Sequence, residues 1–312
     1  MPAPITVNDL LEQTRAQLDE SNSDDVSDDD IVAALNRGQR KAANVLVKHV
    51  PELLITSTTQ STTAGTDTYD VPEDAWGRRV NQITVVRNST EYPLKRVAYR
   101  DLHRYTSASQ VSVPQVYALK GRSYVVKPTP SAGVTLKLWY PRAFETLVVP
   151  QGRITAVSVG SSYVLLDALG SDLTTSTAAL GAFVNIVDAQ TGEIKVSLQT
   201  NAITTATKQV SFKTSGLTYA TVYNRTIATA ITSDVETNDY VCAVQGTCIP
   251  DLPDSCLDFL IQYAVTEIKR RMGETVQEEA ALLKALETDV ERQWAGRESS
   301  HTISNRSRTW QR

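Results

Sequence analysis

The residues of this chain that could do chemistry are clustered acids, three cysteines and three histidines. The densest acidic cluster is the run SDDVSDDD from Ser23 to Asp30. A calcium loop needs oxygen ligands at alternating positions and a glycine at its sharp turn, and Asp29 stands where that glycine would be. Acids in the first turn of a helix are favourable. We therefore interpret the run as a helix start with a solvated acidic face.

A second pair of carboxylates, Asp188 and Glu193, flanks Gly192. Two acids beside a glycine could suggest calcium. The segment Asp188 to Gly192 also has the residue types of a tight turn between two apolar runs. We favour the hairpin turn.

The cysteines Cys242, Cys248 and Cys256 have a spacing that matches no zinc or redox motif. The histidines are scattered along the chain: His49, His103 and His301. We expect reduced cysteines, as in a cytosolic setting, and no bound metal or other cofactor.

Motifs for nucleophilic or nucleotide chemistry are missing from the sequence. There is no G-x-S-x-G elbow to single out a Ser, His and Asp set, and no GxxxxGK[ST] or GxGxxG. The sequence predicts a protein that is not an enzyme and has no catalytic residues. Its function must be argued from its architecture.

The strongest helical pattern covers the stretch from Leu252 to Gly296, which predicts a two-helix hairpin. Pro253 suits the first turn of its first helix, and Gly273 suits the end. Apolar residues fall on one face of each helix at helical spacing. They are Leu257, Leu260, Ile261, Ala264 and Ile268, then Val276, Ala280, Leu283, Leu286, Val290 and Trp294. A hairpin cannot bury both faces alone, so it needs other helices.

The other strong amphipathic helices lie at the N-terminus. Thr6 with Asp9, and Ser27 with Asp30, are typical of helix starts. The second of these helices has the apolar stripe Ile31, Ala34, Leu35, Gly38, Ala42, Val45 and Leu46. The small residues in this stripe would let another helix approach closely, and Pro51 would end the helix. We expect the two ends of the chain to pack together.

The middle of the chain has β patterns. Residues 56–66 are predicted to be a polar connector, followed by short strands up to Tyr140. Residues 149–247 are rich in Thr, Ser, Val and Ile and predict six or seven strands, enough for a barrel or sandwich. The predicted fold is α+β: a helical bundle built from N- and C-terminal helices, a small β domain and an inserted all-β domain.

The expected division has four parts. Residues 1–148 form the N-terminal helices and small β region, and residues 149–247 form the inserted domain. Residues 248–296 complete the bundle, and residues 297–312 form an extended C-terminal arm.

Composition fits an ordinary globular protein, with 41% hydrophobic and 21% charged residues and a net charge of −4. The charge is uneven, since residues 1–30 are acidic and residues 296–312 contain four arginines against one acid. The N-terminus has no signal-peptide pattern, and no apolar run reaches the roughly 18 residues of a membrane span. We expect no membrane association.

The arginine-rich tail is a candidate interface. Trp and Arg are favoured at protein interfaces. The residues concerned are Ile303, Arg306, Arg308, Trp310 and Arg312. A frayed terminus is the simple alternative. Four arginines on an acidic chain are too small a basic surface for nucleic-acid recognition.

Several segments together resemble the head-to-tail adaptor proteins of tailed phages, of the tail tubular protein A type. The segments are ITVNDLLEQTRAQLDE, SDDDIVAALNRGQRKAANVL, TDTYDVPEDAWGRRVNQITVV, YPLKRVAYRDL, PQVYALKGRSYVVKPTP and NDYVCAVQGTCIPDLPDSCLDFLIQYAVTEIKRRMGE. The resemblance covers residues 5–140 and 238–296, and its motifs are patterns of helix, turn and strand.

The resemblance implies a structural protein of the virion neck that is assembled in the host cytoplasm. Such adaptors form a ring, often a dodecamer, between the portal protein and the tail or nozzle protein. Genomic DNA passes through the ring during ejection without sequence recognition. The alternative from another class is a carbohydrate-binding or glycan-cleaving tail component, which would use carboxylates of the insertion such as Asp167, Asp188 and Asp239.

Overall fold

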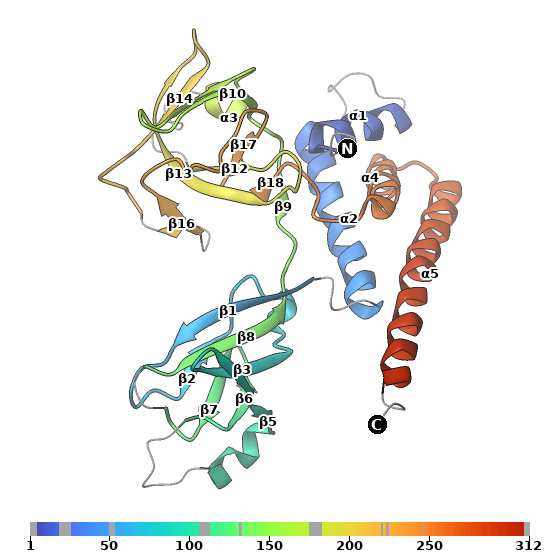
Figure 1. Cartoon of the computed structure of the whole chain (residues 1–312). Helices are drawn as coiled ribbons and strands as arrows, with labels where there is room; N and C mark the ends of the chain where they lie inside the picture. The colour runs from blue at the N-terminus through green and yellow to red at the C-terminus, as the bar shows by residue number, and fades with distance from the viewer. Residues whose placement is uncertain are drawn as a thin grey trace. The chain divides into compact units, whose positions relative to one another are not determined.

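The computed structural model has mixed α+β architecture (Figure 1). It describes residues 5–18, 26–49, 54–105, 113–130, 133–174, 183–219, 221–222, 225–244 and 246–308. The chain forms two compact units, Met1–Val45 with Phe144–Gln293, and Leu46–Ala143 with Trp294–Arg312. The predicted α+β class with an inserted barrel is confirmed. The finer four-part division stays a prediction.

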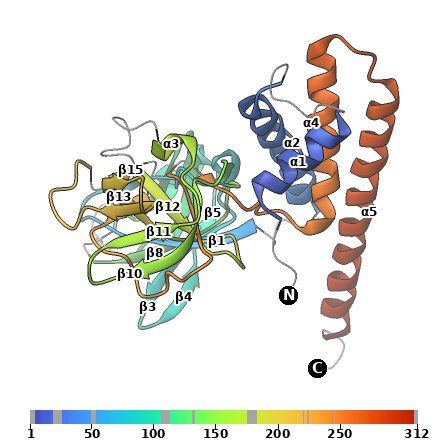
Figure 2. The same cartoon turned by 90° about the horizontal axis from the view of Figure 1, so that it is seen from above.

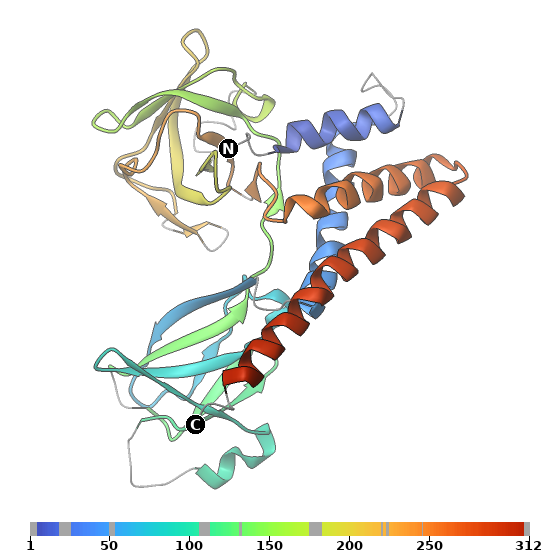
Figure 3. The same ribbon diagram turned by 45° about the vertical axis from the view of Figure 1, so that its right-hand side comes forward.

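Four helices carry the α part of the chain: α1 (Val7–Gln17), α2 (Asp28–His49), α4 (Leu257–Met272) and α5 (Gln277–Arg308). The N-terminal starts are as predicted. Thr6 and Asp9 form a capping box, and the Asp30 amide donates to Ser27 Oγ at 3.2 Å. Gly273 ends α4 in the left-handed conformation, with φ 81°. Figure 3 shows α4 and α5 as a hairpin.

The N- and C-terminal helices of the first unit pack together, as predicted (Figure 2). A Cβ added at Gly38 of α2 would lie only 3.0 Å from the Tyr263 ring of α4, so glycine permits the close approach. Two ion pairs flank the contact, Arg37–Glu267 at 3.2 Å and Lys41–Glu287 at 3.0 Å. The predicted apolar faces of α2 and α4 are buried: Ile31, Ala34, Leu35, Ala42, Val45, Leu257, Leu260, Ile261, Ala264 and Ile268.

The insertion is a closed six-stranded barrel. Its strands follow the order β10–β11–β14–β13–β12–β17, and β17 pairs with β10 to close the ring. The strands are β10 (Gly152–Ser158), β11 (Tyr163–Leu166), β12 (Phe183–Val187), β13 (Ile194–Thr204), β14 (Gln209–Phe212) and β17 (Tyr240–Ala243). Outside the barrel, β16 (Arg225–Ala228) pairs in parallel with β13 and in antiparallel with β15 (Thr221–Val222). The helix α3 (Ser171–Thr174) is a single turn. Alternate side chains fill the interior, among them Ile154, Val164, Val184, Leu198, Val210 and Val241.

The segments that enter and leave the barrel pair with each other. β9 (Thr146–Leu147) and β18 (Gly246–Thr247) form a two-stranded parallel pair. The Asn36 side chain of α2 donates to the Leu147 carbonyl at 2.9 Å and accepts from its amide at 2.8 Å. On the exit side, the Val7 amide of α1 donates to the Cys248 carbonyl at 2.8 Å. Both connections are therefore anchored to the N-terminal helices.

The second unit contains two four-stranded sheets around one core. The first has the order β1 (Ile55–Ser61), β8 (Thr135–Pro141), β3 (Gln82–Arg87) and β4 (Thr90–Pro93). The second has the order β2 (Thr68–Asp70), β7 (Ser123–Lys127), β6 (Val116–Lys120) and β5 (Lys95–Arg96). Short 3-10 helices lie at Trp76–Arg78 and Tyr99–Tyr105. The core includes Tyr69, Ile83, Tyr124, Leu136 and Leu138. The predicted strand pair around Lys120 and Gly121 and the alternation in β8 are confirmed.

Two local predictions are wrong. Residues 56–66 do not form only a polar connector, because β1 covers Ile55–Ser61 and pairs along its length with β8. The residues of β1 are mostly Thr and Ser. The sequence therefore lacks the alternation of apolar and polar residues that predicts a strand, although Thr itself is favourable in strands. The second error is at Gly296, where α5 continues as far as Arg308 instead of ending. A helical glycine costs only about 1 kcal/mol relative to alanine, which the flanking helix-forming residues tolerate. Pro51 lies outside the described residues.

Replacing the fully buried Leu260 by aspartate should destabilise the first unit. The change Leu260→Asp places an unpaired carboxylate on the buried face of α4, at a cost on the order of 3 kcal/mol or more. The matched control is Leu282→Asp on α5, where the leucine is 51% exposed. Urea denaturation followed by circular dichroism checks the prediction. Equal midpoints for Leu260→Asp and wild type would show that the assigned face is wrong.

Candidate functional site

The carboxylates of the insertion that the sequence indicates as candidates, Asp167, Asp188 and Asp239, bind lysine or backbone groups of nearby loops. Lys195 pairs with Asp188 at 2.9 Å and with Asp239 at 3.0 Å. Asp188 Oδ1 also accepts from the amides of Gln190 and Thr191 at 2.7 and 2.8 Å. The Asp188 amide donates to the Glu193 carbonyl at 2.8 Å, so the hairpin-turn interpretation of this segment is confirmed.

The remaining acids of this set also bind backbone. Asp167 accepts from the amides of Arg153 and Ala168 at 2.8 and 2.6 Å, and Asp239 accepts from the Glu236 amide at 2.8 Å. A glycosidase needs two carboxyl groups facing one bond of the substrate. Asp188 and Asp239 instead share a lysine. No observation favours the carbohydrate alternative.

These contacts change the acidity of Asp188. Burial alone would raise the pKa of its carboxyl group. The hydrogen bonds from Lys195 and from the amides of Thr191 and Gln190 outweigh burial and lower the pKa from 3.8 to about 2. Burial alone would lower the pKa of Lys195, but its hydrogen bonds and ion pairs with Asp188 and Asp239 raise it. Asp188 and Lys195 therefore form a structural ion pair that stays charged at neutral pH.

The three cysteines are buried and not disulfide-bonded. Burial raises the pKa of the Cys242 thiol, and a hydrogen bond with Cys248 raises it further. Burial also raises the pKa of the Cys256 thiol. A raised pKa keeps a thiol protonated and unreactive. In the part of the chain that the structure describes, no three His, Cys, Asp or Glu side chains are grouped so that they could hold a metal ion.

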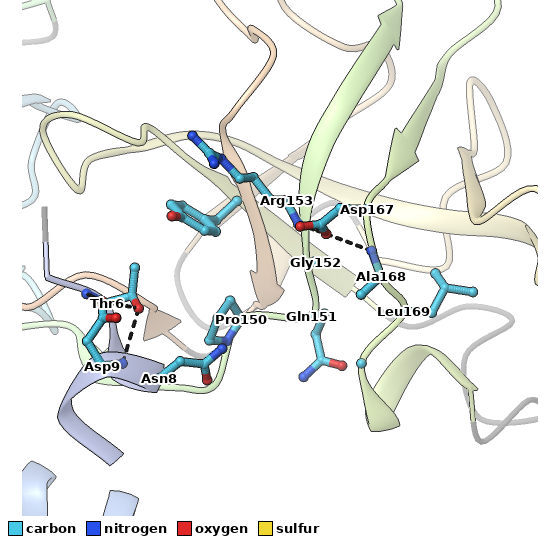
Figure 4. Close-up of a pocket in the computed structure, with 12 residues that line it drawn as sticks. Thr6, Asn8, Asp9, Pro150, Gln151, Gly152, Arg153, Asp167, Ala168 and Leu169 are labelled. Carbon is cyan, nitrogen blue, oxygen red and sulfur yellow. Dashed lines mark hydrogen bonds between the residues drawn. The ribbon is translucent and has the colours of Figure 1, made fainter. Parts of the chain in front are cut away.

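A polar pocket of about 390 Å³ lies where the first turn of α1 meets the start of the barrel (Figure 4). Four separate segments line it: Thr6, Asn8 and Asp9, then Pro150 to Arg153, then Asp167 to Gly170, and Tyr240. Asp9 is already engaged, because it accepts from the Thr6 amide and the Thr6 hydroxyl, each at 2.7 Å. The Asp167 carboxylate is engaged too, because it accepts hydrogen bonds from the Arg153 and Ala168 amides. The pocket has no nucleophile paired with a base, and its chemistry is that of polar binding. Sequence reasoning missed it because no local pattern links the four segments.

The predicted interface residues of the C-terminal tail are only partly within the described residues. The backbone positions of Ile303, Arg306 and Arg308 belong to α5, whereas Trp310 and Arg312 lie outside the described part. Their role as an interface stays a prediction. Within the first unit, Asp30 of α2 pairs with Arg271 of α4 at 3.5 Å.

No helix among the described residues combines the length and apolar character that crossing a lipid bilayer requires.

The comparison with known families decides the classification. The model of the SU10 adaptor protein family matches residues 5–191, which is more than half of the chain. The protein belongs to the SU10 adaptor family. The match covers α1, α2, the β strands of the second unit and the barrel strands as far as β12. No curated protein matches the chain.

Membership of the SU10 adaptor family confirms the coarser part of the sequence resemblance. The protein is a phage adaptor with a structural role, associated with portal and tail components as part of the virion. The narrower likeness to tail tubular protein A stays a prediction.

Asp188 should make the protein sensitive to acid. Its pKa is lower in the folded chain than in the unfolded chain, so its contribution to stability is complete above about pH 4. That contribution is lost as the pH falls towards about 2. The variant Asp188→Asn should therefore be less stable than wild type at pH 7, and its stability should fall less between pH 4 and 2. Denaturation midpoints across this range check the prediction.

The matched control for the acid prediction is Glu193→Gln. Glu193 is exposed in the same turn, and the ion pairs of Lys195 are with Asp188 and Asp239 instead. This variant should keep the wild-type pH profile. An Asp188→Asn profile parallel to that of wild type would contradict the assignment.

Proposed function

We propose that this SU10 adaptor family protein is a head-to-tail adaptor that forms a ring, usually a dodecamer, between the portal and the tail or nozzle of a tailed phage. The match of the family model to residues 5–191 carries the proposal. The finer likeness to adaptors of the tail tubular protein A type is part of it, and so is assembly in the host cytoplasm.

The organisation of the first unit supports this role. A ring subunit contacts its two neighbours through two different surfaces, so it needs a rigid frame. Here helices from both ends of the chain close on each other through Gly38 and Tyr263, with ion pairs on either side. The side chains of Met272 and Leu282, which are 45% and 51% exposed, lie on α4 and α5 and suit contact with another protein.

The chemistry of the described residues supports a structural role. Asp167, Asp188 and Asp239 are tied to lysine or backbone groups, and raised pKa values keep the thiols of Cys242 and Cys256 protonated. A net charge of −4 gives no field that attracts a polyanion. DNA could therefore pass through a ring of such subunits without being retained.

Cryo-electron microscopy of the neck of the assembled virion tests the proposal. We expect a ring of this protein between the portal and the tail, with a central opening wide enough for duplex DNA. A neck without the protein, or the protein present only as single copies, would refute the proposal.

The C-terminal tail should dock onto the portal. Reversing two of its charges with Arg306→Glu and Arg308→Glu, or deleting residues 297–312, should weaken co-sedimentation with the portal roughly 10-fold or more, because interfacial arginines often dominate affinity. Arg292→Glu on the same helix is the matched control, since the Arg292 side chain is 77% exposed. Portal binding by the double variant equal to that of the control would show that the tail does not dock.

A further inference from the structure

The strand β1 is an open edge of unusual length. Edge strands offer unpaired backbone groups to other chains, and proteins protect them by shortening them or by adding charge, proline or bulges. The other edge strands of the described sheets are short: β2 has three residues, β4 has four, and β5, β9, β15 and β18 have two each. In contrast, β1 has seven residues, no charge, no proline and an uninterrupted register with β8 (Figure 1).

Two hydrogen bonds fix which groups of β1 face away from β8. The Arg142 amide donates to the Leu54 carbonyl and the Thr62 amide donates to the Val134 carbonyl, each at 2.8 Å. Residues that bond to the neighbouring strand alternate in an antiparallel pair, so the even-numbered residues of β1 bond to β8. The amides and carbonyls of Ile55, Ser57, Thr59 and Ser61 therefore point to the open side. Within the described residues, no strand pairs with β1 on that side.

We propose that the open edge of β1 pairs with β4 of a second copy of this chain. This inference rests on the proposed ring and names one contact within it. The two strands are the opposite edges of one sheet, β1–β8–β3–β4, and every pair in that sheet is antiparallel. With four strands, β1 and β4 run in opposite directions. Copies placed head to tail along the sheet therefore bring β4 of one against β1 of the next in antiparallel orientation.

The edge of β4 has the groups that this pairing needs. The Leu94 amide donates to the Ile83 carbonyl at 2.8 Å, so Glu91 and Pro93 are the residues of β4 that face away from β3. Glu91 offers an amide and a carbonyl there, and Pro93 offers a carbonyl. Three backbone hydrogen bonds can therefore form with β1 of the neighbouring copy.

The charge on β4 does not oppose the pairing. The Glu91 carboxylate is drawn over the outer face of its own sheet, where it binds Lys137 at 2.7 Å and Thr84 at 3.0 Å. These bonds hold the side chain over its own sheet and neutralise its charge. The contact also joins two different surfaces, as closure of a ring requires.

Hydrogen exchange resolved to single amides tests the pairing directly, using the full chain as dissociated monomer and in the assembled ring. In the monomer, the Ser57, Thr59 and Glu91 amides should exchange fast, while the Thr58 and Gln60 amides are protected by β8. In the ring, the Glu91 amide and at least one of the Ser57 and Thr59 amides should slow by about 100-fold or more.

The outcomes separate this inference from the proposed function. A ring in which Ser57, Thr59 and Glu91 still exchange fast overturns the pairing but leaves the ring intact. If the β1 amides become protected from exchange but the Glu91 amide does not, the strand that pairs with β1 is not β4, and the inference is wrong. If the virion neck holds no ring of this protein, both proposals fail.

Two substitutions complement the exchange measurement. Thr59→Pro removes a donor from the open side of β1 and keeps the bonds to β8, so assembly should need about 10-fold more protein while the fold persists. Thr58→Pro is the matched control, because it removes a bond to β8 and should lower the melting temperature. Ser57→Lys keeps the backbone and adds charge at the open edge, so it should also weaken assembly. Wild-type assembly by both Thr59→Pro and Ser57→Lys would overturn the inference.

Discussion

The first unit depends on the way its N-terminal helices hold the two connections of the barrel. The Asn36 amide group pairs with both backbone groups of Leu147, as a neighbouring strand would, and the Val7 amide holds Cys248. About 100 residues lie between these anchors, so closing the loop opposes folding through lost chain entropy. Specific polar contacts at a close-packed helix interface offset part of that loss. The same two helices pack against α4, so the three helices form one body within the first unit.

Much of this architecture is accessible from sequence because it is encoded locally. Ser27 with Asp30 and Thr6 with Asp9 predict helix starts through contacts three residues apart, and Gly273 predicts a left-handed end. Gly38 predicts a close helix approach, although only the structure shows Tyr263 as the side chain that fills the space. β1 escapes prediction because strand pairing with β8 selects its conformation, and its Thr and Ser residues give no apolar period.

In the candidate sites too, contacts between residues close in the sequence are predictable, whereas contacts between distant residues are not. The turn formed by Asp188 is predictable, since its amide partners lie two and three residues away. The bond between Lys195 and Asp239 spans 44 residues, and no spacing in the sequence indicates it. The pocket beside α1 draws on four segments and is equally hidden. For a member of the SU10 adaptor family, the informative features are thus surfaces and strand edges rather than a catalytic constellation.

The parallel direction of β9 and β18 has a consequence for how the barrel is attached. The chain leaves for the barrel and returns from it at adjacent positions, with Gly246 opposite Thr146 and Thr247 opposite Leu147. Strands that run in the same direction need a crossover connection rather than a tight turn, and here the whole barrel is that connection. The barrel is therefore built into the framework of the first unit, because removing it would also take away the connection that lets β9 and β18 lie in parallel.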